Sequence, residues 1–262
     1  MKMLLDLPDE LLISIIEQLS GERKALCQLA RVCKRLQPLA EAPLYETIFY
    51  REGYQAQGLV NAVTAESRRG AALRYLECRM FWLGAPEVQG VLSDILFSAP
   101  RVREVVIESP YCNHSRWRKV QAGQRWNETM RKILEPFIQA TGLAEGTLER
   151  ESASLGKPLQ NLTSLVMHLN GANREFWTVS PLYGSLFALP ALESLHISSA
   201  NLLADSTSLI PGTFKSPLKH LFLDECNMTL DALRNILAIP KALQSLHLGK
   251  FVARCSACGC GS

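Results

Sequence analysis

One apolar pattern returns six times along the 262 residues of the chain, and it limits the folds that the chain can adopt. The pattern is an apolar residue, two variable residues, a second apolar residue, one variable residue and a third apolar residue. It begins at Leu73, Val102, Leu162, Leu192, Leu218 and Leu243, so that the spacings are 29, 60, 30, 26 and 25 residues. A unit that recurs at such a period cannot bury its apolar face alone and stacks on the next copy. The recurrence therefore predicts a repeat architecture with one strand in each copy.

The stretches between these strands have a helical character, which makes the predicted fold class α/β. Candidate helices span residues 54–67, 86–98, 182–188 and 230–239. The interval of 60 residues equals about two periods, so we expect a degenerate or inserted repeat near residues 110–158. A generic α/β domain is the alternative, and it would show no fixed period from strand to strand.

The six segments resemble leucine-rich repeats. The family template, Leu-x-x-Leu-x-Leu-x-x-Asn/Cys, is met best by LKHLFLDECN at residues 218–227. Cys226 or Asn227 is expected to turn the chain out of the strand there, and Asn170 fills the same place in LTSLVMHLN. The resemblance implies an α/β solenoid, in which a curved parallel sheet is covered by outer helices.

Alternation along each strand assigns its residues to two faces. The first, fourth and sixth template residues are expected to face the core, and the residues between them to line the opposite, concave face. We select from that face a candidate surface for a target protein: His168, His196, His220, Phe222, Asp224 and His247. The alternative is that polar residues simply mark the solvated side of each strand. A third interpretation, metal or general-base chemistry at these histidines, has no further motif in its support.

The first 45 residues have a different pattern, which predicts three short helices. Pro8 suits the first turn of a helix, because its missing N–H costs nothing there. A stripe two residues wide follows, formed by Leu11, Leu12, Ile15, Ile16 and Leu19. Pro38 is expected to end or kink the third segment near Leu36. Three short helices bury little surface, so the width of the stripe indicates that a partner completes the unit.

This N-terminal segment resembles an F-box. The resemblance rests on LPDELL at residues 7–12, VCKRL at residues 32–36 and PLY at residues 43–45, with Ile15, Leu19, Leu26 and Leu29 between them. It implies binding to the Skp adaptor and, through the adaptor, to the cullin and RING subunits of a ubiquitin ligase. The expected adaptor contacts, or their direct support, are Leu7, Pro8, Leu11, Leu12, Ile15, Leu19 and Val32. The alternative is a helical cap on the domain that follows.

The expected domains are an F-box at residues 1–48, a leucine-rich repeat domain at residues 49–251 with its insertion near 110–158, and a disordered tail at residues 252–262. The tail holds Cys255, Cys258 and Cys260, which could bind zinc or copper with Cys226 or His247 as a fourth ligand. The tail is short and rich in glycine and has no second cysteine pair. We therefore expect a frayed end and no bound metal.

Charge and cysteine usage narrow the partners and the compartment. The net charge of +3 is too mild to indicate nucleic acid. A basic, tryptophan-containing stretch at residues 113–132 could bind nucleic acid, but residues 126–138 have the spacing of an amphipathic helix, so we expect an insertion that shapes the binding surface. Acidic residues interrupt the apolar start of the chain, which counts against a signal peptide or a membrane anchor. Most of the eight cysteines are scattered, which favours the cytosol or nucleus.

These patterns lead to one expected function and two alternatives. We expect the substrate-recognition subunit of a Skp–cullin–F-box ubiquitin ligase, with no catalytic residue, cofactor or metal of its own. The first alternative is a non-catalytic leucine-rich repeat scaffold that acts outside ubiquitination. The second is an enzyme or metal-binding protein, although the sequence has no glycine-rich phosphate loop and no His-Glu-x-x-His motif.

Overall fold

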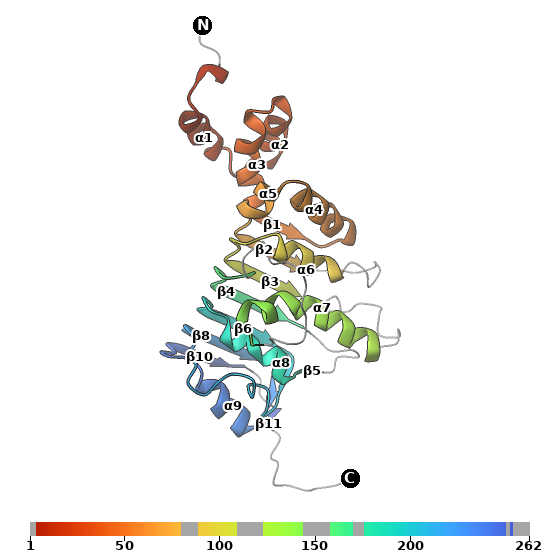
Figure 1. Cartoon of the computed structure of the whole chain (residues 1–262), viewed down its shortest axis with the longest axis vertical. Coiled ribbons are helices and arrows are strands. Elements are labelled where there is room, and N and C mark those ends of the chain that lie inside the picture. Colours follow the sequence, from red (N-terminus) through yellow and green to blue (C-terminus); the bar gives the residue numbers. More distant parts are fainter. Residues whose placement is uncertain are drawn as a thin grey trace.

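The computed structural model describes residues 4–79, 89–108, 123–143, 158–169, 176–249 and 252–253. A set of N-terminal helices is followed by a parallel sheet of seven strands, and the two parts are arranged one after the other along the molecule (Figure 1). No helix in these ranges is long and apolar enough to cross a membrane.

The N-terminal part contains a short 3₁₀ helix, η1 (Leu4–Asp6), and the helices α1 (Asp9–Glu17), α2 (Arg23–Val32) and α3 (Leu36–Glu46). Pro8 is the residue immediately before α1, one position earlier than predicted. The prediction that Pro38 ends or kinks a helix near Leu36 is wrong, because α3 begins at Leu36. Pro38 lies in the first turn of α3, where a backbone N–H has no partner within the helix.

The sheet is formed by β1 (Thr47–Tyr50), β2 (Tyr75–Arg79), β3 (Glu104–Glu108), β4 (Ser164–His168), β6 (Ser194–Ser198), β8 (His220–Asp224) and β10 (Ser245–Leu248). Its strand order is β1-β2-β3-β4-β6-β8-β10, and every neighbouring pair is parallel. The six strands predicted from the recurring pattern are therefore confirmed. The fourth template residues stand opposite one another from β2 to β10: Leu76, Val105, Leu165, Leu195, Leu221 and Leu246.

Two details of the sheet differ from the sequence-based expectations. β1 was not predicted, and it pairs with β2 through Ile48 and Leu76, so the expected F-box boundary at residue 48 falls inside a strand of the sheet. β3 pairs directly with β4, which excludes a degenerate repeat with its own strand between them. The insertion is represented by α7 (Gly123–Thr141), while the rest of the segment 110–158, apart from residues 142 and 143 and residue 158, lies outside the described residues.

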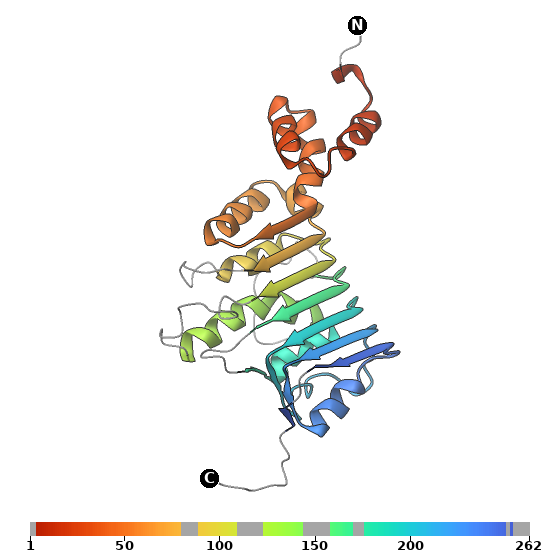
Figure 2. The ribbon, with the colours of Figure 1, turned by 180° about the vertical axis from the view of Figure 1, so that it is seen from behind.

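The helices after β1 lie on one face of the sheet, as Figures 1 and 2 show from opposite sides. They are α4 (Gly53–Ala65), α5 (Ser67–Ala72), α6 (Gln89–Phe97), α7, α8 (Pro181–Gly184), the 3₁₀ helix η4 (Ser185–Ala188) and α9 (Leu230–Leu237). Each predicted helix is present, although the predicted helix at 54–67 is divided into α4 and α5 at Glu66. Residues 86–88 of the predicted helix 86–98 lie outside the described residues. We call the other side of the sheet, seen in front in Figure 2, the open face.

A second, smaller parallel sheet follows the carboxyl ends of the main strands. It contains β5 (Trp177–Val179), β7 (Ala200–Leu202), β9 (Asn227–Met228) and β11 (Val252–Ala253) in the order β11-β9-β7-β5. The chain turns into β7 and β9 at Ser199 and Glu225, which have positive φ angles of 55° and 51°. The turn predicted at Cys226 or Asn227 is thus made at Glu225, one residue before Cys226. The corresponding turn predicted at Asn170 lies outside the described residues. Val252 and Ala253, the first two residues of the tail expected to be disordered, form β11 and pair with β9.

The core lies between the main sheet and its helices. Template residues from β2 to β8 are buried, as are Phe137 of α7 and Phe187 of η4. The last strand differs, because Leu246 and Leu248 of β10 are 40% and 41% exposed. Burial thus follows the predicted alternation, except at this edge of the sheet and at Ser198 of β6, which is buried on the side expected to be exposed.

One buried carboxylate joins the N-terminal helices to the sheet domain. Glu41 of α3 is 6% exposed and forms ion pairs with Arg69 at 2.6 Å and Arg68 at 2.9 Å, both from α5. Burial alone raises the pKa of Glu41, but the hydrogen bonds from Arg69, Gln37 and Arg68 outweigh it and lower the pKa to about 2. The guanidinium of Arg23 in α2 also donates to the carbonyl of Thr47 in β1 at 2.7 Å.

We expect Gly70→Ala to lower the free energy of unfolding by about 2 kcal/mol, because the added methyl group has no room at this site. A Cβ atom at Gly70 in α5 would lie 1.9 Å from the carbonyl oxygen of Ser98, so two backbone segments must move apart. Gly58→Ala in α4 is the control, since its Cβ atom would have no neighbour within 4 Å and alanine favours a helix. Urea unfolding followed by circular dichroism measures both variants. Equal stability of the two would contradict the close contact.

Candidate functional site

The N-terminal helices form a core of their own, which fixes what they leave exposed. Leu12 and Ile16 of α1, Leu26 of α2 and Leu36 of α3 are buried together. Six partly buried residues pack against them: Leu7, Leu19, Leu29, Cys33, Leu39 and Leu44. The apolar stripe of α1 is two residues wide, and Leu12 and Ile16 fill this core. Leu11 and Ile15, on the other side of the stripe, remain outside it.

The exposed half of the stripe consists of large apolar side chains. Leu11 is 51% exposed and Ile15 is 43% exposed, and as residues i and i+4 they share one side of α1. Val32 at the end of α2 is 61% exposed, and Leu4 and Leu5 of η1 are also exposed. We call these five residues the N-terminal apolar surface. Large apolar side chains left exposed on one small unit are a feature of protein interaction sites.

The structure separates the seven residues expected to bind or support the adaptor. Leu11, Ile15 and Val32 belong to the N-terminal apolar surface, and Pro8 is exposed just before α1. Leu7 and Leu19 are partly buried against the core. Leu12 is 1% exposed and belongs to the core of the three helices, the position of a supporting residue.

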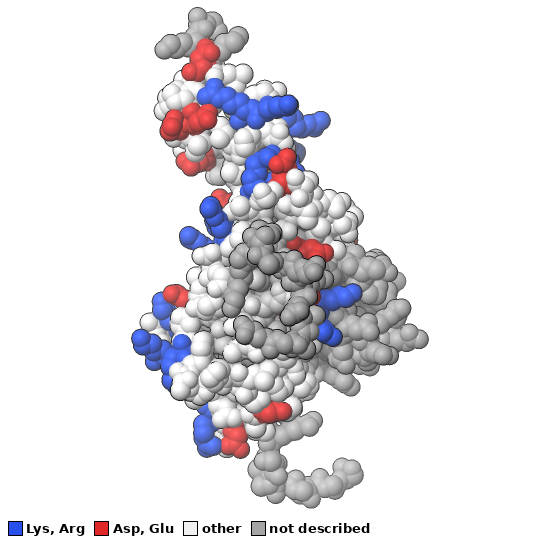
Figure 3. Space-filling view, viewed as in Figure 1, with Lys and Arg blue, Asp and Glu red and all other residues white. Residues whose placement is uncertain are grey.

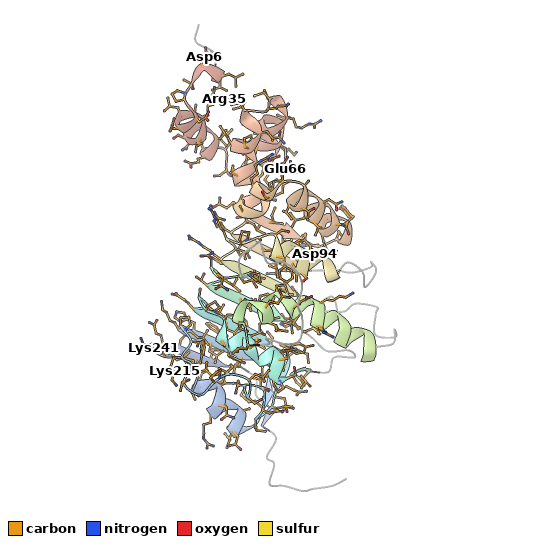
Figure 4. The ribbon with its side chains drawn as sticks, in the orientation of Figure 1. Asp6, Arg35, Glu66, Asp94, Lys215 and Lys241 are labelled. Carbon is orange, nitrogen blue, oxygen red and sulfur yellow. The ribbon has the colours of Figure 1, made fainter. Side chains whose placement is uncertain are left out.

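Arg35, which the sequence-based selection missed, fastens the N-terminus to these helices. Its guanidinium pairs with Asp9 at 2.7 Å and donates to the backbone carbonyls of Leu7, at 2.7 Å, and Leu5. Figure 4 shows Arg35 near the tip of the molecule that carries Asp6. The opposite charges of Asp9 and Arg35 were the available signal, but the sequence does not show that the turn between α2 and α3 brings Arg35 to Asp9.

Four of the six residues predicted as a target surface form one group on the open face. Asp224 of β8 accepts from His196 Nε2 at 2.7 Å, and its other oxygen lies 3.3 Å from His247 Nε2. The ring of Phe222 lies between the two imidazoles, with centroid distances of 5.7 Å to His196 and 5.9 Å to His247. We call these four residues the aromatic group. The carboxylate holds both imidazoles in place beside the Phe222 ring.

The other two predicted residues lie beside this group. His220 Nδ1 is 2.8 Å from the hydroxyl of Ser245, on the neighbouring strand β10. His168 is on β4, where it stands opposite Ser198 of β6. Ser198, expected on the concave face, is buried, and its carbonyl accepts a hydrogen bond from Trp177 Nε1 at 3.2 Å.

The opposite end of the open face is acidic. Arg79 of β2 pairs with Glu77 at 2.5 Å and lies 3.7 Å from Glu108 of β3. The Tyr75 hydroxyl donates to Glu77 at 2.6 Å, and Glu104 stands opposite Tyr75 on β3. Burial, and then the hydrogen bond to Glu77, raise the pKa of Tyr75 to about 12. The predicted alternation puts Glu77, Arg79, Glu104 and Glu108 on this face, but none of them was selected as a site.

The residues that the structure describes give no support to metal chemistry. Within the described ranges, no group of three or more His, Cys, Asp and Glu side chains could hold a metal ion. Cys226, a possible fourth ligand for the tail cysteines, is buried, and burial raises its pKa to about 11. Cys255, Cys258 and Cys260 lie outside the described residues.

Comparison with known families identifies the N-terminal unit. Residues 4–51 match the model of the F-box-like family, so the chain contains an F-box-like domain that covers α1 to α3 and β1. A search of curated proteins finds no match. F-box domains generally bind the Skp adaptor, and F-box proteins are generally non-catalytic adaptors. The match ends just after β1, close to the predicted boundary at residue 48.

Proposed function

We propose that the protein is a substrate receptor of a Skp–cullin–F-box ubiquitin ligase. The observation that carries the proposal is the N-terminal apolar surface on an F-box-like domain, where Leu11 and Ile15 stay exposed beside a complete core. In this role the domain binds the Skp adaptor, and the adaptor links the chain to cullin and RING subunits. Ubiquitin transfer is then carried out by the partner subunits, and the chain contributes proximity.

We further propose that the rest of the chain is a leucine-rich repeat domain that binds the target. The identical register of the fourth template residues from β2 to β10 supports this assignment, as do the helices on one face. The aromatic group and the acidic end of the sheet both lie on the open face, where a target protein could reach them. The proposed role places the protein in the cytosol, the nucleus or both.

The double substitution Leu11→Asp with Ile15→Asp is expected to abolish co-purification with the Skp adaptor, because it places two charges in an apolar contact. Both side chains are exposed, so the fold should tolerate the change. The single variants Ile15→Asp and Ile13→Asp form a matched pair: Ile13 is 40% exposed but lies on another side of α1. Only Ile15→Asp should weaken binding. Undiminished recovery of adaptor with the double variant would contradict the proposal.

Recovery of cullin distinguishes the receptor from a scaffold outside ubiquitination. Purified chain, adaptor and cullin are mixed and separated by size-exclusion chromatography. The receptor predicts a complex of all three proteins that the double variant does not form. A chain that binds the adaptor while excluding cullin would favour the scaffold.

A further inference from the structure

The charge of the open face differs from the charge of the whole chain. On strands β2 to β10 this face carries four carboxylates and one guanidinium: Glu77, Glu104, Glu108, Asp224 and Arg79. On β1, Phe49 stands opposite Glu77, and the guanidinium of Arg51 lies 4.7 Å from the centre of its ring, which adds a second positive charge at this end. The whole chain has a net charge of +3. A partner on strands β2 to β10 of the open face therefore meets an excess of negative charge.

Among the described residues, several Lys and Arg lie along the edge where the main strands begin. Arg74 and Arg103 directly precede β2 and β3, and the Arg103 N–H donates to the Arg74 carbonyl at 2.8 Å. Lys219 precedes β8 in the same way, and Arg101, Lys215 and Lys241 lie in the turns nearby. Lys and Arg are prominent along this edge in Figure 3, and Figure 4 labels Lys215 and Lys241 there. The excess of carboxylates on β2 and β3 gives this end of the open face a preference for a cation.

A continuous row of side chains joins the acidic end of the open face to the aromatic group. In register from strand to strand it contains Glu77, Val106, Val166, His196, Phe222 and His247. Val106 and Val166 are partly exposed, so the middle of the row is apolar. Both oxygens of Asp224 are engaged by imidazoles, which leaves the Phe222 ring and its two neighbours as a fixed contact for an apolar side chain.

We propose that the open face binds an extended segment of the target that carries a Lys or Arg beside the carboxylates of β2 and β3 and a large apolar residue on the aromatic group. This inference rests on the proposed function and names the chemistry of its target. Three strand spacings separate β3 from β8, or about 14 Å. An extended chain covers that distance in about four residues. The two recognised side chains should therefore lie about four residues apart.

Fluorescence anisotropy with synthetic peptides on the full chain tests this directly. Peptides carry one arginine and one leucine in a glycine–serine background, in both orders and with separations of two to eight residues. We expect the tightest binding near a separation of four, and binding at least tenfold weaker when glutamate replaces the arginine. High salt should weaken the arginine peptide, because the ion pair is partly exposed. Equal or tighter binding of the glutamate peptide, or absence of binding by both, would overturn the proposal.

Two variants locate the contacts. Glu104→Gln should weaken the arginine peptide about threefold, as expected for an exposed ion pair. Phe222→Ala should weaken it about tenfold, as expected for an aromatic residue at the centre of a contact. Glu17→Gln in α1 is the control with the same loss of charge, and it should have no effect. Unchanged affinity in both open-face variants would show that the peptide binds at another site and would contradict the proposal.

These outcomes are independent of adaptor binding. If the peptides fail while Leu11 and Ile15 remain necessary for the adaptor, only the inference about the target is wrong. If the peptides bind as expected while the adaptor binds without Leu11 and Ile15, the docking half of the proposed function is wrong.

Discussion

Replacing Trp177 by alanine is expected to lower the free energy of unfolding by about 4 kcal/mol. Trp177 is 2% exposed and lies on β5, at the edge of the smaller sheet. Its indole N–H donates to the Ser198 carbonyl at the end of β6, and its backbone N–H donates to Ser199. The alanine variant therefore leaves a large cavity and a buried carbonyl without its indole donor. Thermal and urea unfolding measure the loss.

Two further substitutions separate the contributions of Trp177. Trp177→Phe keeps most of the apolar contact and loses the hydrogen bond, so it should cost about 1–2 kcal/mol. Tyr54→Ala removes an aromatic ring that is 76% exposed on α4 and should change stability by less than about 0.5 kcal/mol. A loss for Trp177→Ala no larger than that for Tyr54→Ala would show that the smaller sheet does not depend on the indole.

Glu41→Gln is expected to lower the free energy of unfolding at pH 7 by about 3 kcal/mol, because it leaves the partly buried guanidinium of Arg69 without a countercharge. Arg68 is 38% exposed, so water solvates part of its charge when Glu41 is removed. The expected loss in the free energy of unfolding therefore stays at the lower end of the range for buried ion pairs. Glu66→Gln is the matched control, because Glu66 also pairs with Arg68 but is 44% exposed. It should cost less than about 1 kcal/mol.

Wild type and Glu41→Gln should also differ in how their stability responds to acid. The pKa of Glu41 is lowered from 4.5 to about 2 in the folded chain, so the unfolded chain takes up this proton first as the pH falls. The stabilisation by Glu41 is complete above pH 4.5 and is lost progressively towards pH 2. The difference between wild type and Glu41→Gln should therefore shrink between pH 5 and pH 2. A constant difference over that range would contradict the buried ion pair.

The repeating strands could be predicted from sequence because burial imposes the same spacing on every copy. β1 was not predicted, because the first, fourth and sixth positions of the pattern are filled there by Tyr45, Ile48 and Tyr50. These residues also lie where the F-box pattern ends. The smaller sheet escaped for a different reason. Its strands have only two or three residues, too few for alternation to be visible.

The candidate sites were predictable as far as local spacing decides them. Alternation placed His196, Phe222 and His247 on one face, and the helical period placed Leu11 beside Ile15. Spacing alone could not show that Leu12 fills the small core while Leu11 does not, because that depends on how α1 packs against α2 and α3. It also could not show that Asp224 engages two histidines from strands on either side of it.

The junction between α3 and β1 determines where the chain can be divided into folded fragments. α3 ends at Glu46 and β1 begins at Thr47, so no exposed linker separates the helices from the sheet. A fragment that stops at residue 48 would divide β1 and remove Arg68 and Arg69, the partners of Glu41. Limited proteolysis should therefore release no folded helical fragment from the intact chain. The smallest piece that keeps every partner of Glu41 extends through α5.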